Sequence, residues 1–224
     1  MNLKELEARV KALEKQTQKL QDIEEIKTLQ KSYGYYLEHW MADEIIDLFA
    51  DSPDVSLTLA AGTYKGKKSV IKYFKRMSDP NPEFMHQVMQ LSGIVNVAPN
   101  GKTAKGRWYG FGALSIPSSR GVSQMFMGGI YSGEYIKEDS VWKFKSLRFD
   151  QVYSGTPAQG WVKSDRLFVT SPQANLPRLE ADIPRKVSYR YPSGNIVPFH
   201  YKHPVTGKAT SEEKRNAAIK KAKN

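Results

Sequence analysis

The part of the chain that decides the fold begins with the stretch EFMHQVMQLSGIVNVA, residues 83–98. Apolar and polar residues alternate along it, as they do in half-buried β-strands. A turn at residues 99–102, PNGK, leads into a second such stretch at residues 103–116, and two more follow at residues 122–138 and 141–155. Long alternating stretches joined by short turns predict a meander of antiparallel strands.

Helical patterns dominate the chain before residue 83. Residues 22–40 repeat apolar side chains at helical spacing, and Asp22 with Glu25 forms a box-like start that predicts a helix beginning there. A short helix at residues 42–53, a strand-like stretch at 54–66 and an amphipathic helix at 67–77 follow. Helices followed by a strand meander predict an α+β fold, with the helices on one face of a curved sheet.

The segment before Asp22 carries a short heptad seam. Leu3, Leu6, Val10, Leu13 and Leu20 are spaced three or four residues apart, with charged residues between them. Two or three heptads are marginal as an isolated helix, so we expect the seam to pack on its own domain or, preferably, on another subunit. The chain therefore divides into an N-terminal helix (1–20), a central domain (21–152) and an irregular C-terminal arm with a basic tail (153–224).

The composition restricts the class of protein. The chain has 224 residues, 40% of them hydrophobic, and no cysteine, which favours one domain with extensions in a reducing, cytoplasmic setting. No signal peptide and no stretch of ~20 apolar residues occurs, so we expect no membrane partner. The net charge is +11, but residues 151–224 alone hold 13 basic and 5 acidic residues. Because the excess lies in the C-terminal third, we expect no nucleic-acid partner.

Four stretches in order resemble one family. DIEEIKTLQKSYGYYLEHWMADEIIDLFADSPDV (22–55) resembles the first helices of SnoaL-like proteins, within the nuclear-transport-factor-2-like superfamily. GTYKGKKSVIKYF (62–74), FMHQVMQLSGIVNVAPNGKTAKGRWY (84–109) and GGIYSGEYIKEDSVWKFKSLRF (128–149) resemble later elements. The resemblance implies a cone-shaped α+β fold, in which helices and a bent sheet surround an apolar cavity. Members include scytalone dehydratase, bile-acid dehydratase, cyclases, isomerase relatives and lignin-related formaldehyde lyases, and most need no cofactor.

The resemblance also implies site residues. A Tyr and an acid five residues apart match Tyr33 and Glu38, and the strand histidine matches His86. Arg148 matches an arginine on the last strand. Further candidates for binding substrate are Tyr109 and Arg107, which alternate on one strand and share a face, and Tyr131 on the neighbouring strand.

These residue types suit acid–base chemistry. A neutral imidazole can accept a proton near pH 7, a carboxylate stabilises the imidazolium that forms, and phenols bind an oxygen on which charge develops. The expected function is that of a cofactor-independent lyase, which eliminates water or formaldehyde from a hydrophobic aromatic or polycyclic hydroxylated substrate, as in aromatic catabolism. We expect no metal and a homo-oligomer, either dimer or trimer.

Several alternatives remain open from the sequence. An isomerase or cyclase would use the same residues without a leaving group, and a non-catalytic protein could only bind a small apolar ligand. Tyr33 could be ordinary core, Glu38 a solvated helix-end charge, and Arg148 a partner of Asp150.

Overall fold

A computed structural model of the chain describes residues 2–77, 83–118, 121–162, 179–185 and 195–222. The helices are α1 (Leu3–Glu38), α2 (Ala42–Asp47), α3 (Lys67–Phe74), the single-turn η1 (Lys75–Met77) and α4 (Glu212–Ala222). The strands are β1 (Ser56–Leu59), β2 (Gly62–Lys65), β3 (Met85–Val97), β4 (Thr103–Ser118), β5 (Gly121–Glu138), β6 (Val141–Gly155) and β7 (Ile183–Pro184).

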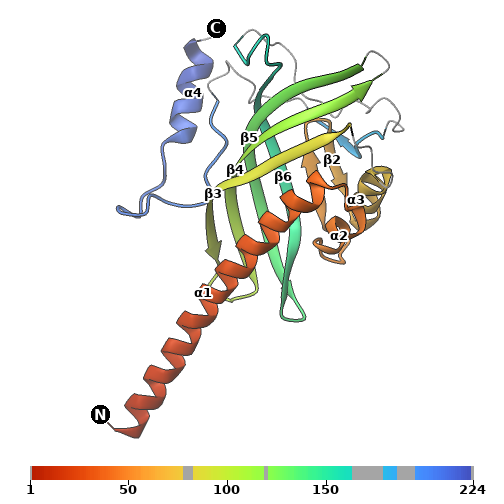
Figure 1. Ribbon diagram of the computed structural model, residues 1–224. Coiled ribbons are helices and arrows are strands. Elements are labelled where there is room, and N and C mark those ends of the chain that lie inside the picture. Colours follow the sequence, from red (N-terminus) through yellow and green to blue (C-terminus); the bar gives the residue numbers. More distant parts are fainter. Residues whose placement is uncertain (1, 78–82, 119–120, 163–178, 186–194, 223–224) are drawn as a thin grey trace.

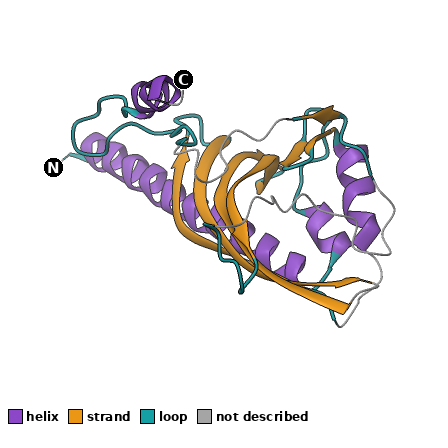
Figure 2. Cartoon of the chain, turned by 90° about the horizontal axis from the view of Figure 1, so that it is seen from above, coloured by secondary structure: helices purple, strands orange, loops and turns teal. Residues whose placement is uncertain are grey.

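The strands form one sheet in the order β3-β4-β5-β6-β1-β2-β7. β3 to β6 pair antiparallel with their chain neighbours, as the alternating stretches predict. β1 joins the sheet parallel to β6, and β2 then pairs antiparallel with β1. The sheet is strongly curved and open, with α1 running beside it (Figures 1 and 2). The predicted α+β fold, with helices packed on a curved sheet, is confirmed.

A bulge in β3 helps to bend the sheet. Its pairing with β4 shifts between Leu91 and Ile94, and Ser92 has a positive φ of 50°. A Cβ at Gly93 would lie 2.0 Å from the ring of Trp108, so the indole packs directly over the glycine backbone. Bulges increase the local twist of a strand, and a glycine there allows close approach.

The two faces of the sheet have different surroundings. The inner face packs against α1 and α3 and carries buried side chains such as Val88, Trp108 and Leu114. The outer face lies opposite and carries exposed apolar residues of the alternate set, such as Tyr109 and Phe111. Successive residues of a strand point to opposite faces of the sheet. The face of any other residue in a strand without a bulge therefore follows from these examples.

The first helix is continuous for 36 residues, beginning at a capping box of Asn2 and Glu5. The predicted helix start at Asp22 is therefore wrong. Asp22 lies inside α1, is 2% exposed, and accepts hydrogen bonds from Trp142 Nε1 at 3.1 Å and from the ammonium of Lys137. An aspartate followed by a glutamate three residues later fits a helix cap, but here the carboxylate has tertiary partners instead.

Two described segments of the C-terminal arm lie against the sheet. β7 pairs with β2, and the segment around Val197 to Phe199 contacts Arg107 on the outer face. The basic tail includes a helix, α4, whose Asn216 side chain bonds the backbone of Ile196 at 2.7 and 2.8 Å. The parts of the predicted arm at 163–178 and 186–194 lie outside the described residues. Among the described helices, none is long and apolar enough to cross a membrane.

Candidate functional site

His86 lies near the start of β3, with its side chain on the inner face. Its neighbours on that face are Phe84, whose ring it meets edge-on at 5.7 Å between centroids, and Val88 in the core. The side chain is half-buried, and its removal from water lowers the pKa of His86 to about 4. The imidazole is therefore neutral at pH 7 and has a nitrogen lone pair with which to accept a proton.

Two buried phenols lie on the same side of the sheet. Tyr33 on α1 and Tyr131 on β5 pack edge-to-face, with 6.1 Å between ring centroids. Burial raises the pKa of both hydroxyls well above the usual value, and each phenol lies close enough to other tyrosines to add to that shift. Both phenols are therefore protonated at all ordinary pH values and can donate a hydrogen bond.

A buried chain of amides and rings connects this region to α1. Gln30 accepts a hydrogen bond from Tyr135 at 2.7 Å and donates to Gln90 at 2.8 Å. Tyr135 in turn accepts from the indole of Trp108 at 3.1 Å, and Gln90 also hydrogen-bonds Tyr131. Sequence reasoning missed this chain. Its signal was Gln30, a polar residue inside an otherwise apolar helical stripe, since a fully buried amide must have partners.

Trp40 is the second residue that sequence reasoning missed. It follows α1 with a positive φ of 58°, which is rare for a large side chain, and its ring meets Phe84 edge-on at 4.4 Å. Trp40, Phe84 and His86 thus form a row of rings. The Trp40 Nε1–H is buried and has no hydrogen-bond partner among the described residues. Strained backbone conformations cluster at functional sites, and a buried donor without a partner requires an explanation.

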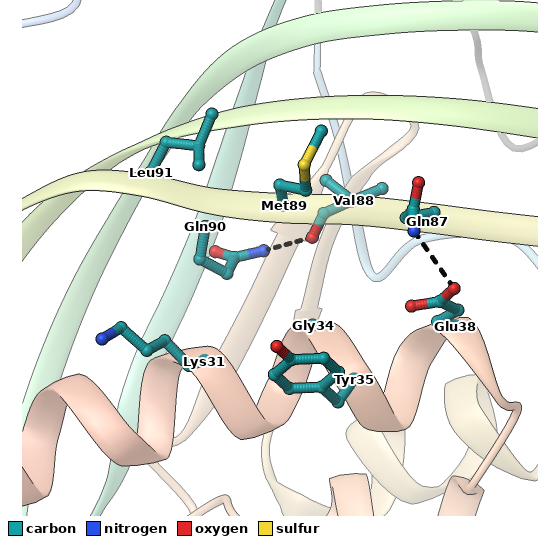
Figure 3. Close-up of a pocket in the computed structure, with 9 residues that line it drawn as sticks. All are labelled: Lys31, Gly34, Tyr35, Glu38, Gln87, Val88, Met89, Gln90 and Leu91. Carbon is teal, nitrogen blue, oxygen red and sulfur yellow. Dashed lines mark hydrogen bonds between the residues drawn. The ribbon is translucent and has the colours of Figure 1, made fainter.

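Glu38 lies in a groove between α1 and the free edge of β3 (Figure 3). The groove has a volume of about 480 Å³ and is also lined by Lys31, Tyr35 and residues 87–91. Gln87 donates to the Glu38 carboxylate at 3.3 Å. Gln87 follows His86 in the chain and projects from the opposite face of the strand, so the structure places Glu38 beside the His86 segment without an ion pair to the imidazole.

Two further candidates, Arg107 and Tyr109, share one face of β4 as their alternation predicts, and it is the outer face. Tyr109 is 57% exposed. The Arg107 guanidinium donates to the carbonyls of Val197 and Pro198 at 3.2 and 3.0 Å and lies 4.4 Å from the centre of the Phe199 ring. Arg107 therefore holds the C-terminal arm against the sheet, on the face opposite His86.

Arg148 also lies on the outer face, beside Ser132 in the sheet register. Its Nε donates to both carboxylate oxygens of Asp150, at 3.0 and 2.9 Å, and Asp150 accepts a further bond from Arg185 at 2.7 Å. The structure thus contains the ion pair between Arg148 and Asp150, which is the alternative role of Arg148 left open by the sequence. Of the seven predicted residues, the structure brings His86, Tyr33 and Tyr131 to the inner face.

Comparison with known proteins identifies the family. The model of the SnoaL-like domain matches residues 18–148, which is more than half of the chain. The chain belongs to the SnoaL-like family. The matched part of this SnoaL-like protein contains all seven predicted site residues, and it excludes the start of α1 and the C-terminal arm.

Solved structures show the same fold at low sequence identity. A proposed scytalone dehydratase from Novosphingobium aromaticivorans is 17% identical, with a TM-score of 0.55, over 63% of this chain and 91% of its own. A proposed aromatic ring hydroxylase from the same organism is 18% identical, with a TM-score of 0.51, over 61% and 94%. A type 2 hexachlorocyclohexane dehydrochlorinase (LinA) is 17% identical, with a TM-score of 0.50, over 63% and 92%.

The described residues of this SnoaL-like protein contain no group of three or more His, Asp or Glu side chains that could hold a metal ion. The inner face carries the imidazole of His86, which burial keeps neutral, and the protonated phenols of Tyr33 and Tyr131. This set can accept a proton at one atom and donate hydrogen bonds to an oxygen at others.

Proposed function

We propose that this SnoaL-like protein is a cofactor-independent lyase for a hydrophobic, hydroxylated aromatic or polycyclic molecule. The observation that carries the proposal is His86, a half-buried imidazole that burial keeps neutral, on the same sheet face as the buried phenols of Tyr33 and Tyr131. The dehydratase and the dehydrochlorinase among the structural relatives support elimination as the reaction class. Apolar surroundings favour a substrate that is itself largely apolar.

The proposed reaction begins with transfer of a proton from the substrate to the imidazole of His86. In dehydration, the C–H electron pair forms a new double bond, the C–O bond breaks, and the departing hydroxide takes the proton from the His86 imidazolium to leave as water. In formaldehyde release, His86 takes the hydroxyl proton of a hydroxymethyl group, and the C–C bond breaks as the C=O bond of formaldehyde forms. The C–C electron pair is left on the aryl-bearing carbon, which takes the proton from the His86 imidazolium. Tyr33 and Tyr131 would donate to the oxygen on which charge develops.

Glu38 would support the charge of the imidazolium from the groove side of β3. Its carboxylate is already held next to this strand segment by Gln87. A negative charge near a histidine favours the protonated form, which is the product of the first step. Trp40 would supply a further hydrogen bond to a substrate oxygen, because its buried N–H has no other partner among the described residues.

A substrate survey tests the proposal. The purified protein is incubated, without any added cofactor, with hydroxylated diaryl compounds that bear a hydroxymethyl group and with hydroxylated polycyclic compounds. We expect saturable conversion of at least one compound, with release of water or formaldehyde identified by mass spectrometry and aldehyde trapping. Saturable binding without conversion would point to a binding protein, and a product isomeric with the substrate would point to an isomerase or cyclase. Either result overturns the lyase assignment.

The pH dependence of turnover tests the state of His86. A base must be deprotonated to act, so kcat/KM is expected to stay level from about pH 8 to about pH 5 and to fall through an apparent pKa of about 4. An exposed histidine would give a fall near ~6.5 instead. Rates taken within seconds of a pH jump, with circular dichroism at each pH, separate titration from unfolding. A fall centred near the exposed-histidine value contradicts the buried, neutral imidazole.

Trp40→Phe tests the unpartnered indole. The phenyl ring keeps most of the contact with Phe84 but lacks the N–H donor. Loss of one neutral hydrogen bond to substrate is expected to raise KM by about 3- to 10-fold. Trp161→Phe is the matched control, because Trp161 is 47% exposed and packs on Tyr153, away from the row of rings. Equal KM values for both variants would show that the Trp40 N–H makes no bond to substrate.

A further inference from the structure

The first half of α1 carries an apolar stripe that nothing in the described chain covers. Residues 3–20 are all exposed, and this half of the helix projects away from the body of the protein (Figure 1). The large apolar side chains of the stripe are 44–71% exposed, namely Leu3, Leu6, Val10, Leu13 and Leu20. An unsupported helix of this length is marginal in water, so a partner along the stripe would stabilise it.

The stripe follows a heptad repeat. The a positions are Leu3, Val10 and Thr17, and the d positions are Leu6, Leu13 and Leu20. The next a and d positions would be Glu24 and Lys27, which pair with each other at 2.6 Å, so the repeat ends there. From Asp22 onward α1 instead buries a different set of side chains against its own sheet. The exposed half and the docked half of the helix thus have separate apolar faces.

We propose that two copies of this chain associate through residues 3–20 of α1 as a parallel, two-stranded coiled coil. Val at a combined with Leu at d favours two parallel strands, and this combination occurs at the centre of the seam, with Val10 at a and Leu6 and Leu13 at d. The charges beside the seam agree with this arrangement. In a parallel pair, Arg9 at a g position faces Glu14 at the e position of the second copy, and the converse pair forms by symmetry.

An antiparallel arrangement is disfavoured by the same residues. Aligning the apolar layers head to tail would set Glu7 opposite Glu14 of the second copy, twice in each dimer. Like charges across the seam repel, whereas the parallel arrangement has one attractive pair on each side. The resulting stalk would be about 27 Å long at 1.5 Å per residue, with both SnoaL-like domains at one end. The proposal is independent of the proposed reaction.

Light scattering on the full chain tests the association. We expect the wild type to reach the mass of two 25.4-kDa chains as its concentration rises through the micromolar range. Leu13→Glu places a charge in the seam and is expected to raise the dissociation constant at least about 100-fold. Ala8→Glu, at the outward f position of the same helix, is the matched control and should leave the dimer intact. A monomeric wild type, or a dimer that survives Leu13→Glu, overturns the proposal.

The orientation is tested by cross-linking and by charge exchange. Because the chain has no cysteine, Leu6→Cys introduces a single thiol. In a parallel pair the two introduced thiols face each other at the same d layer, and under an added oxidant they should form a disulfide-linked dimer. In an antiparallel pair the two thiols would lie far apart. Arg9→Glu is expected to weaken the dimer about 3- to 10-fold, and adding Glu14→Arg should restore it. A dimer that dissociates on Leu13→Glu but forms no cross-link refutes the parallel orientation.

Discussion

His86→Ala is expected to lower kcat/KM by about 10²- to 10⁴-fold on any compound that the wild type converts, because it removes the proposed general base. The other groups of the inner face stay in place, so saturable binding of the compound should persist. Burial already keeps the imidazole neutral, and alanine has no lone pair that could replace it. Single-turnover rates and equilibrium binding, measured on the same samples, separate loss of chemistry from loss of affinity.

Two further variants make the His86 experiment decisive. His39→Ala removes the exposed histidine at the end of α1 and should leave kcat/KM within about twofold of wild type, as expected of a surface substitution. His86→Asn restores side-chain volume and polarity without basicity, and it should be as inactive as His86→Ala. If His86→Asn retains most of the activity, His86 is not the general base and only contributes to packing on the inner face of the sheet.

Asp22→Ala is expected to lower the free energy of unfolding by about 3–5 kcal/mol, because it leaves a buried cation without its partner. The carboxylate is 2% exposed and accepts hydrogen bonds from three side chains, those of Lys137, Trp142 and Gln18. Its removal leaves the Lys137 ammonium, 17% exposed, and the Trp142 indole N–H unpaired beside α1. Urea unfolding monitored by tryptophan fluorescence measures the change. Glu25→Ala, one turn on and exposed, is the control and should change stability by less than about 0.5 kcal/mol.

The pH dependence of this contribution has a definite sign. Burial alone would raise the pKa of Asp22, but the hydrogen bonds from Lys137, Trp142 and Gln18 outweigh it and the pKa is lowered. A carboxylate whose pKa is lowered by folding stabilises the fold at pH values above its unfolded-state pKa of ~3.9. This stabilisation is lost as the pH falls through the folded-state pKa. The stability difference between wild type and Asp22→Asn should therefore be constant from about pH 5 to 8 and shrink below about pH 4. A constant difference down to pH 2 would falsify the ionised, paired state.

The predicted site residues show where sequence reasoning ends. Alternation along β4 places Arg107 and Tyr109 together, and the structure has them on one face. Which face becomes the inside depends on where α1 and the C-terminal arm pack, and alternation contains no information about that. The C-terminal arm binds Arg107 through two backbone carbonyl groups and the ring of Phe199. These groups are about 90 residues from Arg107 in the sequence, so no local pattern encodes the contact.

Asp22 and Gln30 illustrate the same limit on α1. Both were visible as polar residues in or beside an apolar helical pattern, and their burial follows from partners more than 100 residues away, Trp142 and Tyr135. Trp40 carried no sequence signal, because a positive φ and a buried indole N–H without a partner among the described residues are properties of the folded chain.

The sequence by itself determined the α+β class, the strand meander from residue 85 onward and the heptad seam at the start of α1, because these follow from the periods of apolar residues along the chain. Only the tertiary structure decided which sheet face encloses His86, that Asp22 is an ion-pair partner inside a continuous helix, and that Glu38 lies in a groove beside β3. The physical reason is that periodicity records the conformation of neighbouring residues, whereas burial, pKa and hydrogen-bond partners depend on segments that meet only when the chain packs.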